Sequence, residues 1–425
     1  MNVLYEDNHL LVVEKPVNIP VQADASGDDD LLTLCKCYIK ETCHKPGEVY
    51  LALIHRLDRP VGGVMVFART SKAAQRLSAQ FRGREAKKRY VAIADGDPAP
   101  QAELTDWLKK DEATFSSAVV PEGTEGAKLA KLRYSTIAKK DGMALLDVEL
   151  FTGRAHQIRV QLKNAGLPIH GDQRYHPNAT VGTQIALWAY ALTISHPTLA
   201  EPMTFFSVPQ GGTWQAFSQQ LAFLPAFSVC RGVYADDDIL VVDKNAGVEV
   251  EEGLKSELSS IFGEVYPVHR LDANTLGLVV LARNQSTKAR LEKAFAAHET
   301  EKIYHALVVG TPKKADALVD YGVKDSDDAL MRIVPQKTRG AVKMELSYRT
   351  LATQDGISLV EIVLHTGKTH QIRVQMANAG YPVLGDDKYG DRERNREKHC
   401  RTQQLVAKRL TVLGKTFESL RELKL

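Results

Sequence analysis

The stretch His55-Arg56-Leu57-Asp58 is decisive for this chain, because the same four residues return as His269-Arg270-Leu271-Asp272. Each copy leads within a few residues into a short apolar run, residues 63–69 after the first and 277–283 after the second. Apolar runs of this length are typical of buried strands. We therefore expect a duplicated chain in which each Asp lies on a loop at the mouth of a strand, where scaffolds commonly present functional groups.

The length and composition are those of an ordinary soluble protein with more than one domain. Its 425 residues exceed what a single hydrophobic core usually supports, and two domains fit the repeat. Hydrophobic residues make up 44% and charged residues 25% of the chain. No apolar run reaches the about 18 residues that suggest a membrane span. The amino terminus lacks the basic start and apolar stretch of a signal peptide. We therefore expect a cytoplasmic protein with no membrane partner.

Neither charge nor cysteine content defines a function. The formal net charge of +3 is only mildly basic, so a nucleic acid would have to meet local patches of Lys and Arg. Five irregularly spaced cysteines argue against a disulfide framework and agree with a reducing compartment. Cys35, Cys37, Cys43 and His44 cluster as zinc ligands do, but the usual two-residue gap is missing and the second half has no counterpart. Because Cys35 also belongs to an apolar helical face, we expect a helix here and no metal site.

Beyond the His-Arg-Leu-Asp stretch, the two halves keep one fixed spacing of 214 positions. The longest shared block is Thr-Gly-x-x-His-Gln-Ile-Arg at residues 152–159 and 366–373, which we expect to form a strand. Repeats of this length are whole domains, since solenoid units run to about 50 residues. Single residues at the same spacing are Tyr90 and Tyr304, Gly96 and Gly310, His156 and His370, Arg159 and Arg373, and Asp172 and Asp386.

Local patterns predict several elements and one domain boundary. Ser71 and Ser286 are expected to act as the N-caps of two equivalent helices. Pro and Gly residues at 209–213, with the stretch up to 229, indicate an exit from one domain and a short linker. We place the boundary near residue 225, which gives domains 1–225 and 226–425. Strands are predicted within residues 5–15, 144–150, 234–244 and 358–364.

Taken alone, His-Arg-Leu-Asp is a weak pattern, since a single loop Asp is commonly a turn residue. Together with a downstream Tyr, the Thr-Gly-x-x-His-Gln-Ile-Arg block and Gly-Asp-x-x-Tyr, it resembles the RluA-type pseudouridine synthases over nearly all of both halves. The resemblance implies two tandem α+β domains, each a mixed, mainly antiparallel sheet with flanking helices and a central active-site cleft. It also implies an enzyme that isomerises uridine to pseudouridine in structured RNA, either ribosomal or transfer RNA.

This reaction breaks the N-glycosidic bond, turns the uracil over and joins C5 to the sugar. It requires a carboxylate and a pocket, and no cofactor or metal. The resemblance assigns the carboxylate to Asp58 and Asp272, with Arg159 and Arg373 as their ion-pair partners. A nearby guanidinium favours the charged form of a carboxylate that burial would otherwise protonate. A purely structural ion pair is the alternative, although such pairs contribute little to stability by themselves.

Two further residue types are carried over from the family. Tyr90 and Tyr304 match its active-site tyrosine, whose ring can stack on the base and whose hydroxyl can transfer a proton. The alternative is an ordinary core tyrosine. Arg56 and Arg270 resemble the arginine that fills the gap left by the extruded nucleotide. For these two, the alternative is a surface salt bridge.

A basic run precedes the tyrosine of each half and is denser in the first. Such a run is usually a solvated face. This one abuts the next shared motif, so we expect Arg84, Lys87 and Lys88 to bind RNA. The run comprises Arg82, Arg84, Lys87, Lys88 and Arg89 in the first half, against Lys293 and Lys302 in the second.

The sequence departs from the family pattern in several places. Arg59-Pro60-Val61-Gly62-Gly63 and Ala273-Asn274-Thr275-Leu276-Gly277 replace the usual loop, so we expect loop hydrogen bonds to differ. Gln161 and Gln375 stand where the family often has His. The second half also ends without a match to residues 195–205. We therefore expect weaker RNA contacts there and a dominant first half.

Two other functions remain open. One is an RNA-binding protein with vestigial catalytic residues, which the presence of Asp, Tyr and Arg in both halves argues against. The other is a glycosidase or nuclease, which would need a second carboxylate or a metal cluster. Asp172 and Asp386 are candidates for that carboxylate, but their setting indicates a turn. No feature of the sequence defines an oligomeric state.

Overall fold

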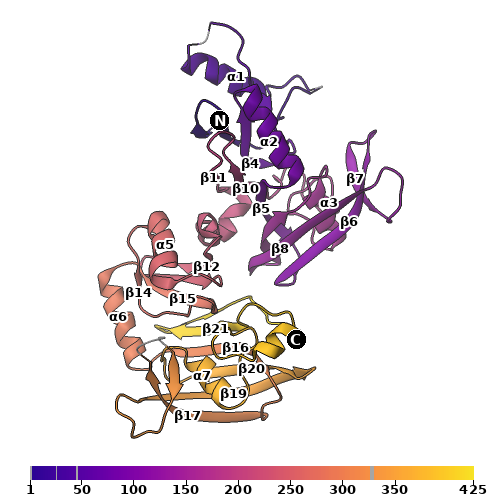
Figure 1. Cartoon of the computed structure of the whole chain (residues 1–425). Coiled ribbons are helices and arrows are strands. Elements are labelled where there is room, and N and C mark those ends of the chain that lie inside the picture. The colour runs from indigo at the N-terminus through magenta and orange to yellow at the C-terminus, as the bar shows by residue number, and fades with distance from the viewer. Residues whose placement is uncertain (1, 25, 45, 326–329) are drawn as a thin grey trace. The chain divides into compact units, whose positions relative to one another are not determined.

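The chain divides into two compact units, Met1–Ala222 and Phe223–Leu425 (Figure 1). The computed structural model describes residues 2–24, 26–44, 46–325 and 330–425. Within these residues, each unit contains one 11-stranded sheet, mixed but mainly antiparallel, with helices packed against it. The predicted fold class of two tandem α+β domains is confirmed.

The sheet of the first unit has the strand order β1-β2-β4-β10-β5-β9-β8-β6-β7, with β3 beside β4 and β11 beside β10. Its strands are β1 (Asn2–Glu6), β2 (Leu10–Lys15), β3 (Ala52–Leu53), β4 (Gly62–Ala68), β5 (Lys87–Asp95), β6 (Gln101–Asp111), β7 (Ser116–Val120), β8 (Lys128–Lys140), β9 (Met143–Leu150), β10 (Leu187–Ser195) and β11 (Pro202–Phe206). Its helices are α1 (Leu31–Thr42), α2 (Ser71–Gly83), α3 (Gln157–Asn164) and α4 (Ser218–Leu221), with the 3-10 helix η1 (Gly212–Phe217).

The second unit repeats this order as β12-β13-β15-β21-β16-β20-β19-β17-β18, with β14 beside β15 and β22 beside β21. Its strands are β12 (Cys230–Ala235), β13 (Ile239–Lys244), β14 (Tyr266–Pro267), β15 (Leu276–Ala282), β16 (Glu301–Val309), β17 (Ala315–Lys324), β18 (Met331–Ile333), β19 (Val342–Gln354), β20 (Ile357–Leu364), β21 (Leu405–Val412) and β22 (Lys415–Glu418). Its helices are η2 (Leu224–Ala226), the π-helix η3 (Val250–Leu254), α5 (Lys255–Phe262), α6 (Gln285–Ala296), α7 (Gln371–Asn378) and α8 (Arg392–Glu397). The four predicted strand segments correspond to β1 and β2, β9, β12 and β13, and β20, and are confirmed.

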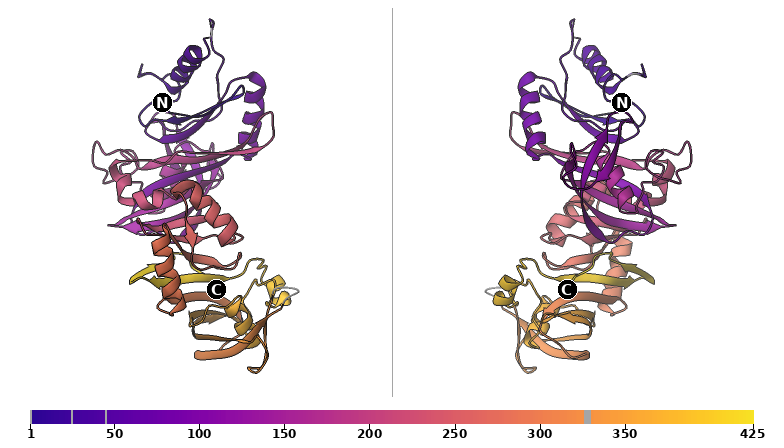
Figure 2. Two further views of the ribbon diagram at one scale, coloured as in Figure 1. Left: turned by 90° about the vertical axis from the view of Figure 1, so that its left-hand side faces the viewer. Right: turned by 90° about the vertical axis from the view of Figure 1, so that its right-hand side faces the viewer.

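The side chains of β2 alternate between two cores, because successive residues of a strand point to opposite faces of a sheet. Leu11 and Val13 join the core under α1, whereas Leu10 and Val12 join the core under α2. The second unit repeats the arrangement with β13, α5 and α6. The helices and strands can be followed from two further sides in Figure 2. Each sheet is thus buried on both faces at the strands that lead to the Asp loop.

The expectation of a strand at the Thr-Gly-x-x-His-Gln-Ile-Arg block is wrong. Residues from Gln157 onward form helix α3, and the equivalent residues form α7. Ile158 and Val160 alternate as in a strand, but it is Ile158 and Leu162, four residues apart, that share the main core. That spacing is helical. The block therefore presents its arginine from the first turn of a helix.

The expected capping serines are also wrong by one or two residues. Thr70 precedes α2 and its side chain accepts a hydrogen bond from the backbone N–H of Ala73. Asn284 does the same for α6 with the N–H of Thr287. Thr and Asn are good N-cap residues, and only the residue before the first helical turn can play this part.

The expectation that the second half lacks a closing segment is corrected by β22. This strand pairs antiparallel with β21, as β11 pairs with β10. A tight turn at Leu413 and Gly414, both with positive φ, replaces the longer loop of the first unit. Ser207 and Ser419 then occupy equivalent places, each donating to a carboxylate of the second strand of its unit at 2.6 Å. The sequences differ because the loop is shorter, while the hairpin is retained.

The segment expected to be a short linker contains the helical turns η1, α4 and η2. Among the five cysteines, Cys35 is buried on the inner face of α1, while Cys37 and Cys43 are exposed. No group of three metal-ligating side chains occurs among the described residues. Within the same residues, no helix is long and apolar enough to cross a membrane.

Candidate active site

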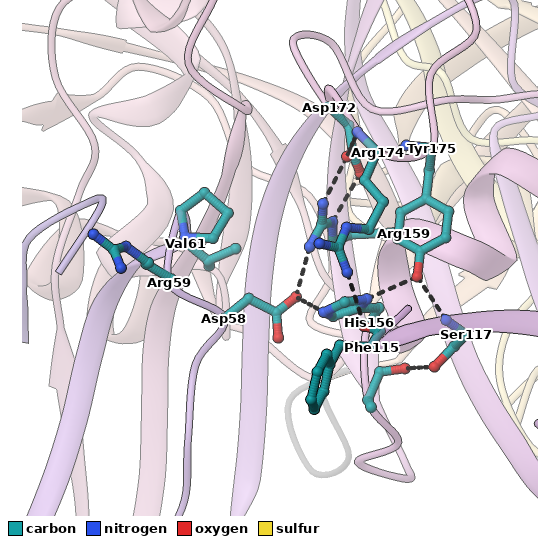
Figure 3. Close-up of polar contacts among 12 residues, drawn as sticks. Asp58, Arg59, Val61, Phe115, Ser117, His156, Arg159, Asp172, Arg174 and Tyr175 are labelled. Atoms are coloured by element: carbon teal, nitrogen blue, oxygen red, sulfur yellow. Dashed lines mark hydrogen bonds and ion pairs between the residues drawn. The ribbon is translucent and has the colours of Figure 1, made fainter. Parts of the chain in front are cut away.

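Asp58 lies in the loop between β3 and β4, as the sequence indicates, and its carboxylate points toward Arg159 and His156 (Figure 3). The backbone N–H of Val61 closes a turn onto the Asp58 carbonyl at 3.0 Å. Asp272 is placed identically, with Thr275 closing the turn at 3.0 Å. The two carboxylate side chains are 27% and 19% exposed, so both remain accessible to a substrate.

Arg159 joins two carboxylates. One terminal nitrogen of its guanidinium donates to Asp58 at 3.1 Å, while its Nε and other terminal nitrogen donate to Asp172 at 2.8 and 2.7 Å. In the second unit, Arg373 makes the equivalent bond to Asp272 at 2.9 Å and the equivalent pair of bonds to Asp386. A bidentate carboxylate fixes the plane of a guanidinium. The catalytic carboxylate candidate therefore faces an arginine that cannot rotate freely.

The charge of this arginine is secured electrostatically. Burial lowers the pKa of Arg159, but the hydrogen bonds and charge of Asp172, and then of Asp58, raise it above its ordinary value. The same causes raise the pKa of Arg373. The predicted pairs of Asp58 with Arg159 and of Asp272 with Arg373 are thus present. Each is part of a larger arrangement with Asp172 or Asp386, and Arg373 also contacts Asp387 at 3.3 Å.

A histidine and a tyrosine border each carboxylate. Nε2 of His156 lies 3.8 Å from Asp58, and its Nδ1 lies 2.7 Å from the hydroxyl of Tyr175. That hydroxyl accepts from the backbone N–H of Ser117 at 2.8 Å, so its own proton can go to Nδ1. Burial lowers the pKa of His156 despite the charge of Asp58, which leaves a neutral ring with Nε2–H facing the carboxylate. His370 and Tyr389 repeat the arrangement.

Tyr90 and Tyr304 lie on β5 and β16, each 8% exposed, in the main core of its unit. Burial, and then the charge of the nearby Asp58 or Asp272, raises the pKa of each hydroxyl. Each tyrosine therefore packs in the core with a neutral hydroxyl group that lies close enough to the carboxylate to be affected by its charge.

A buried lysine at the end of the second strand supports each Asp loop. The Lys15 ammonium donates to the carbonyls of Pro16, Arg59 and Val61 at 2.8 to 2.9 Å. Lys244 donates to the carbonyls of Asn245, Val248 and Ala273. Lys15 thus contacts the loop twice and Lys244 once, so the loop hydrogen bonds do differ as expected. Burial lowers the pKa of Lys15 to about 7 and that of Lys244 to about 8.

The predicted RNA-binding residues occupy different environments. Arg56, Arg270, Arg84 and Lys87 are exposed, and none of them has an ion-pair partner in the described part of the chain. The surface salt bridge considered for Arg56 and Arg270 is therefore absent there. Arg89, from the same basic run, forms an ion pair with the buried Asp147 and so links the neighbouring strands β5 and β9 of the sheet.

Lys88 differs from its neighbours because its ammonium is largely buried. Its Nζ lies 3.2 Å from where a Cβ would stand on Gly153, and burial lowers its pKa. Lys302 stands over Gly367 in the same way, 3.6 Å from the corresponding point. The second unit thus has a lysine equivalent to Lys88, and this is the Lys302 of its shorter basic run.

Sequence reasoning missed the anchoring part of Asp172 and Asp386, the His–Tyr contacts and the buried lysines. Each had a signal, since Lys15 and Lys244 both end the second strand of their unit, and Gly-Asp-x-x-Tyr occurs in both halves. The turn predicted at Asp172 is present. The side chain of Asp172 is fully buried against Arg159, and a sequence pattern does not show this burial.

Comparison with known proteins agrees with this geometry. The profile of the RNA pseudouridylate synthase family matches residues 9–164 and 238–378, more than half of the chain and once in each unit. Over 215 residues, covering 48% of this chain and 90% of the relative, the chain is 33% identical to the dual-specificity RNA pseudouridine synthase RluA of Salmonella typhi. It is 38% identical over 181 residues, 37% of this chain and 55% of the relative, to an uncharacterized RNA pseudouridine synthase of Aquifex aeolicus.

Solved structures include human RNA pseudouridylate synthase domain containing 4, which is 24% identical with a TM-score of 0.43, covering 52% of this chain and 92% of that one. Because the family profile matches once in each unit, the two units represent two copies of an RNA-modifying isomerase domain. The chain belongs to the RNA pseudouridylate synthase family, and its partner is RNA.

Proposed function

We propose that each unit carries its own active site, with Asp58 and Asp272 as the catalytic carboxylates, acting on uridines in ribosomal or transfer RNA. The observation that carries the proposal is the repeated arrangement in which a fully buried carboxylate fixes an arginine that in turn pairs with a part-exposed Asp. Buried ion pairs do little for stability alone. Two copies of the same costly arrangement at equivalent loops favour a chemical role.

In this proposal the carboxylate acts on the sugar or the base while the N1–C1′ bond breaks and the C5–C1′ bond forms. The product is an isomer of the substrate, so the proton lost from C5 is balanced by one gained at N1. Arg159 holds Asp58 in place through a charge-assisted hydrogen bond, and Tyr90 supplies a neutral hydroxyl that can donate or relay a proton. Arg373 and Tyr304 act likewise with Asp272. His156 and His370 orient the site.

Target uridines inside a stack must be extruded before they reach either carboxylate. Arg56 and Arg270 belong to the same short segments as the Asp residues and are exposed, with no ion-pair partner in the described part of the chain, which suits insertion into the vacated stack. Arg84, Lys87 and Lys88 are proposed to contact phosphates. Because the inner lysine and the closing hairpin occur in both units, these features give no reason for one unit to dominate.

A hydrolytic function is less well supported. A glycosidase needs a second carboxyl group able to exchange protons with the substrate. Asp172 is the nearest candidate from the sequence, but its side chain is fully buried and both of its oxygens bind Arg159. Among the residues that the structure describes, the site therefore offers one reactive carboxylate rather than two.

We place the functional domains at 1–225 and 226–425, close to the division between the compact units, and propose a cytoplasmic location, where ribosomal and transfer RNA are found. Pseudouridine mapping across total RNA from cells with and without this gene tests the substrate class. Loss of pseudouridine at defined ribosomal or transfer RNA positions is expected. Unchanged maps in both RNA classes would refute this substrate class.

A further inference from the structure

Phe115 is an exposed aromatic residue at the tip of the β6–β7 hairpin, beside the first candidate active site (Figure 3). Its side chain is 65% exposed, the highest value for any aromatic among the described residues. A single exposed apolar side chain is ordinary in itself. The surroundings of Phe115 set it apart.

The hairpin tip is held to the site by hydrogen bonds from three directions. The Arg174 guanidinium donates to the carbonyl of Phe115 at 2.8 Å. Two residues on, the N–H of Ser117 donates to the hydroxyl of Tyr175, and its side chain donates to the carbonyl of Ala155. Arg174, Tyr175 and Ala155 flank the residues that hold Asp58. The ring of Phe115 is therefore presented at the mouth of the site by a fixed backbone.

This placement is conformationally costly. Phe115 has φ of 52°, in the left-handed region that bulky residues rarely adopt. An Asn or Gly would fit such a turn with less strain and would not expose a ring to water. Lys110, whose ammonium is ion-paired with Glu112 at 2.6 Å, places that ammonium 5.4 Å from the ring centre. A flat apolar face next to a cation is the chemistry that binds nucleobases and their phosphates.

We propose that Phe115 is a stacking platform for an unpaired RNA base next to the target uridine of the first unit. The inference rests on the proposed RNA-modifying function and adds a base-binding subsite outside the carboxylate, arginine and tyrosine set. Extruding a uridine leaves its neighbours partly unstacked, and an aromatic face at the site entrance replaces that lost stacking. The platform is specific to the first unit, because the sequence has Ala329 at the position 214 residues on, which lies outside the described residues.

The test uses full-length protein carrying Asp272→Asn, so that only the first site turns over. Phe115→Ala, Phe115→Leu and Phe115→Tyr are compared with Leu199→Ala, which removes a similarly exposed apolar side chain from the β10–β11 loop. Two measurements are made: affinity for a fluorescently labelled uridine-only RNA oligonucleotide, and kcat and KM on a transcript containing a uridine identified by the mapping experiment.

Phe115→Ala and Phe115→Leu should weaken oligonucleotide binding and raise KM by about 5- to 100-fold, with kcat at saturation retained. Phe115→Tyr should behave as the parent, because a tyrosine ring also stacks, and Leu199→Ala should change nothing. Parent-like affinity and KM for Phe115→Ala or Phe115→Leu would overturn the inference. If no RNA is modified while oligonucleotide binding still depends on Phe115, the proposed function fails and the stacking site stands.

Discussion

Replacing Arg159 by Met separates what the buried ion pair does for the fold from what it does for chemistry. The change removes the guanidinium from between Asp58 and Asp172 while keeping a side chain of similar length. Two carboxylates lose their partner together, one part-exposed and one fully buried. The two losses have different consequences.

The stability effect comes from Asp172. Leaving a buried charge without its partner costs about 3–5 kcal/mol. The two N–H groups of Arg174 and Tyr175 that still donate to Asp172 should bring the loss toward the lower figure. The effect on turnover comes from Asp58, which loses a charge-assisted hydrogen bond worth about 1.5–3 kcal/mol. If that bond stabilises the reacting carboxylate, single-turnover rates should fall by about 10- to 150-fold.

Both effects can be measured in the Asp272→Asn background. All three tryptophans, Trp107, Trp188 and Trp214, belong to the first unit, so tryptophan fluorescence during urea denaturation reports that unit alone. Single-turnover rates on an RNA transcript containing a mapped uridine report the chemistry at pH 6, 7 and 8. The double variant Arg159→Met with Asp172→Asn removes the unpaired buried charge and serves as the matched control.

We expect the double variant to recover most of the lost stability and none of the lost rate. A single variant that turns over as the parent across this pH range would refute the assigned role of Arg159. Recovery of rate along with stability in the double variant would show that the arginine acts only through the fold.

Two further predictions concern the sheet that carries the Asp loop. Burial lowers the pKa of Lys15 to about 7 from its ordinary 10.5, so the unfolded chain binds more protons than the folded one between these values. The unfolding free energy should therefore rise with pH in this range, by up to about 1.4 kcal/mol per pH unit. In urea denaturation at pH 7, 8 and 9, the unfolding free energy of wild type minus that of Lys15→Met should increase with pH, and a constant difference would contradict the assignment. Gly62 pairs with Trp188, whose ring lies 2.2 Å from where a Cβ would stand, whereas the equivalent pair in the second unit is Leu276 with Val406. Gly62→Leu should therefore destabilise the first unit by about 1–3 kcal/mol or more, and adding Trp188→Val should recover most of that loss. Equal stability of the single and double variants in urea denaturation would be inconsistent with this packing.

The sequence was most informative where a motif is repeated. The two Asp loops, the strands that follow them and the pairing of Asp58 with Arg159 all follow from the fixed spacing and the family resemblance. The strand predicted at residues 152–159 is a helix from Gln157 onward, and it is the shared core position of Ile158 and Leu162 that shows the helical spacing.

Other features depend on atoms that the sequence does not bring together. Lys15 is 44 positions from Arg59 in the sequence. It binds backbone carbonyl groups, which every residue has, so the residue types do not reveal these contacts. β22 could not be matched from the sequence, because its hairpin turn is shorter than that of the first unit and the two halves are already 218 positions apart at Trp188 and Val406. The residues of the basic run also differ in burial, which the sequence does not show. Arg89 pairs with Asp147, and the Nζ of Lys88 lies close to Gly153.

The central claim is that each unit has one working carboxylate. Asp58→Asn, Asp272→Asn and the double variant should each be returned to cells that lack the gene, and the dependent positions then measured by mass spectrometry of RNA fragments. Each single variant should lose the pseudouridines made by its own unit while binding RNA as wild type does, because the change removes charge and little volume, and the double variant should lose them all. Full pseudouridine levels at every position in the double variant would contradict the account.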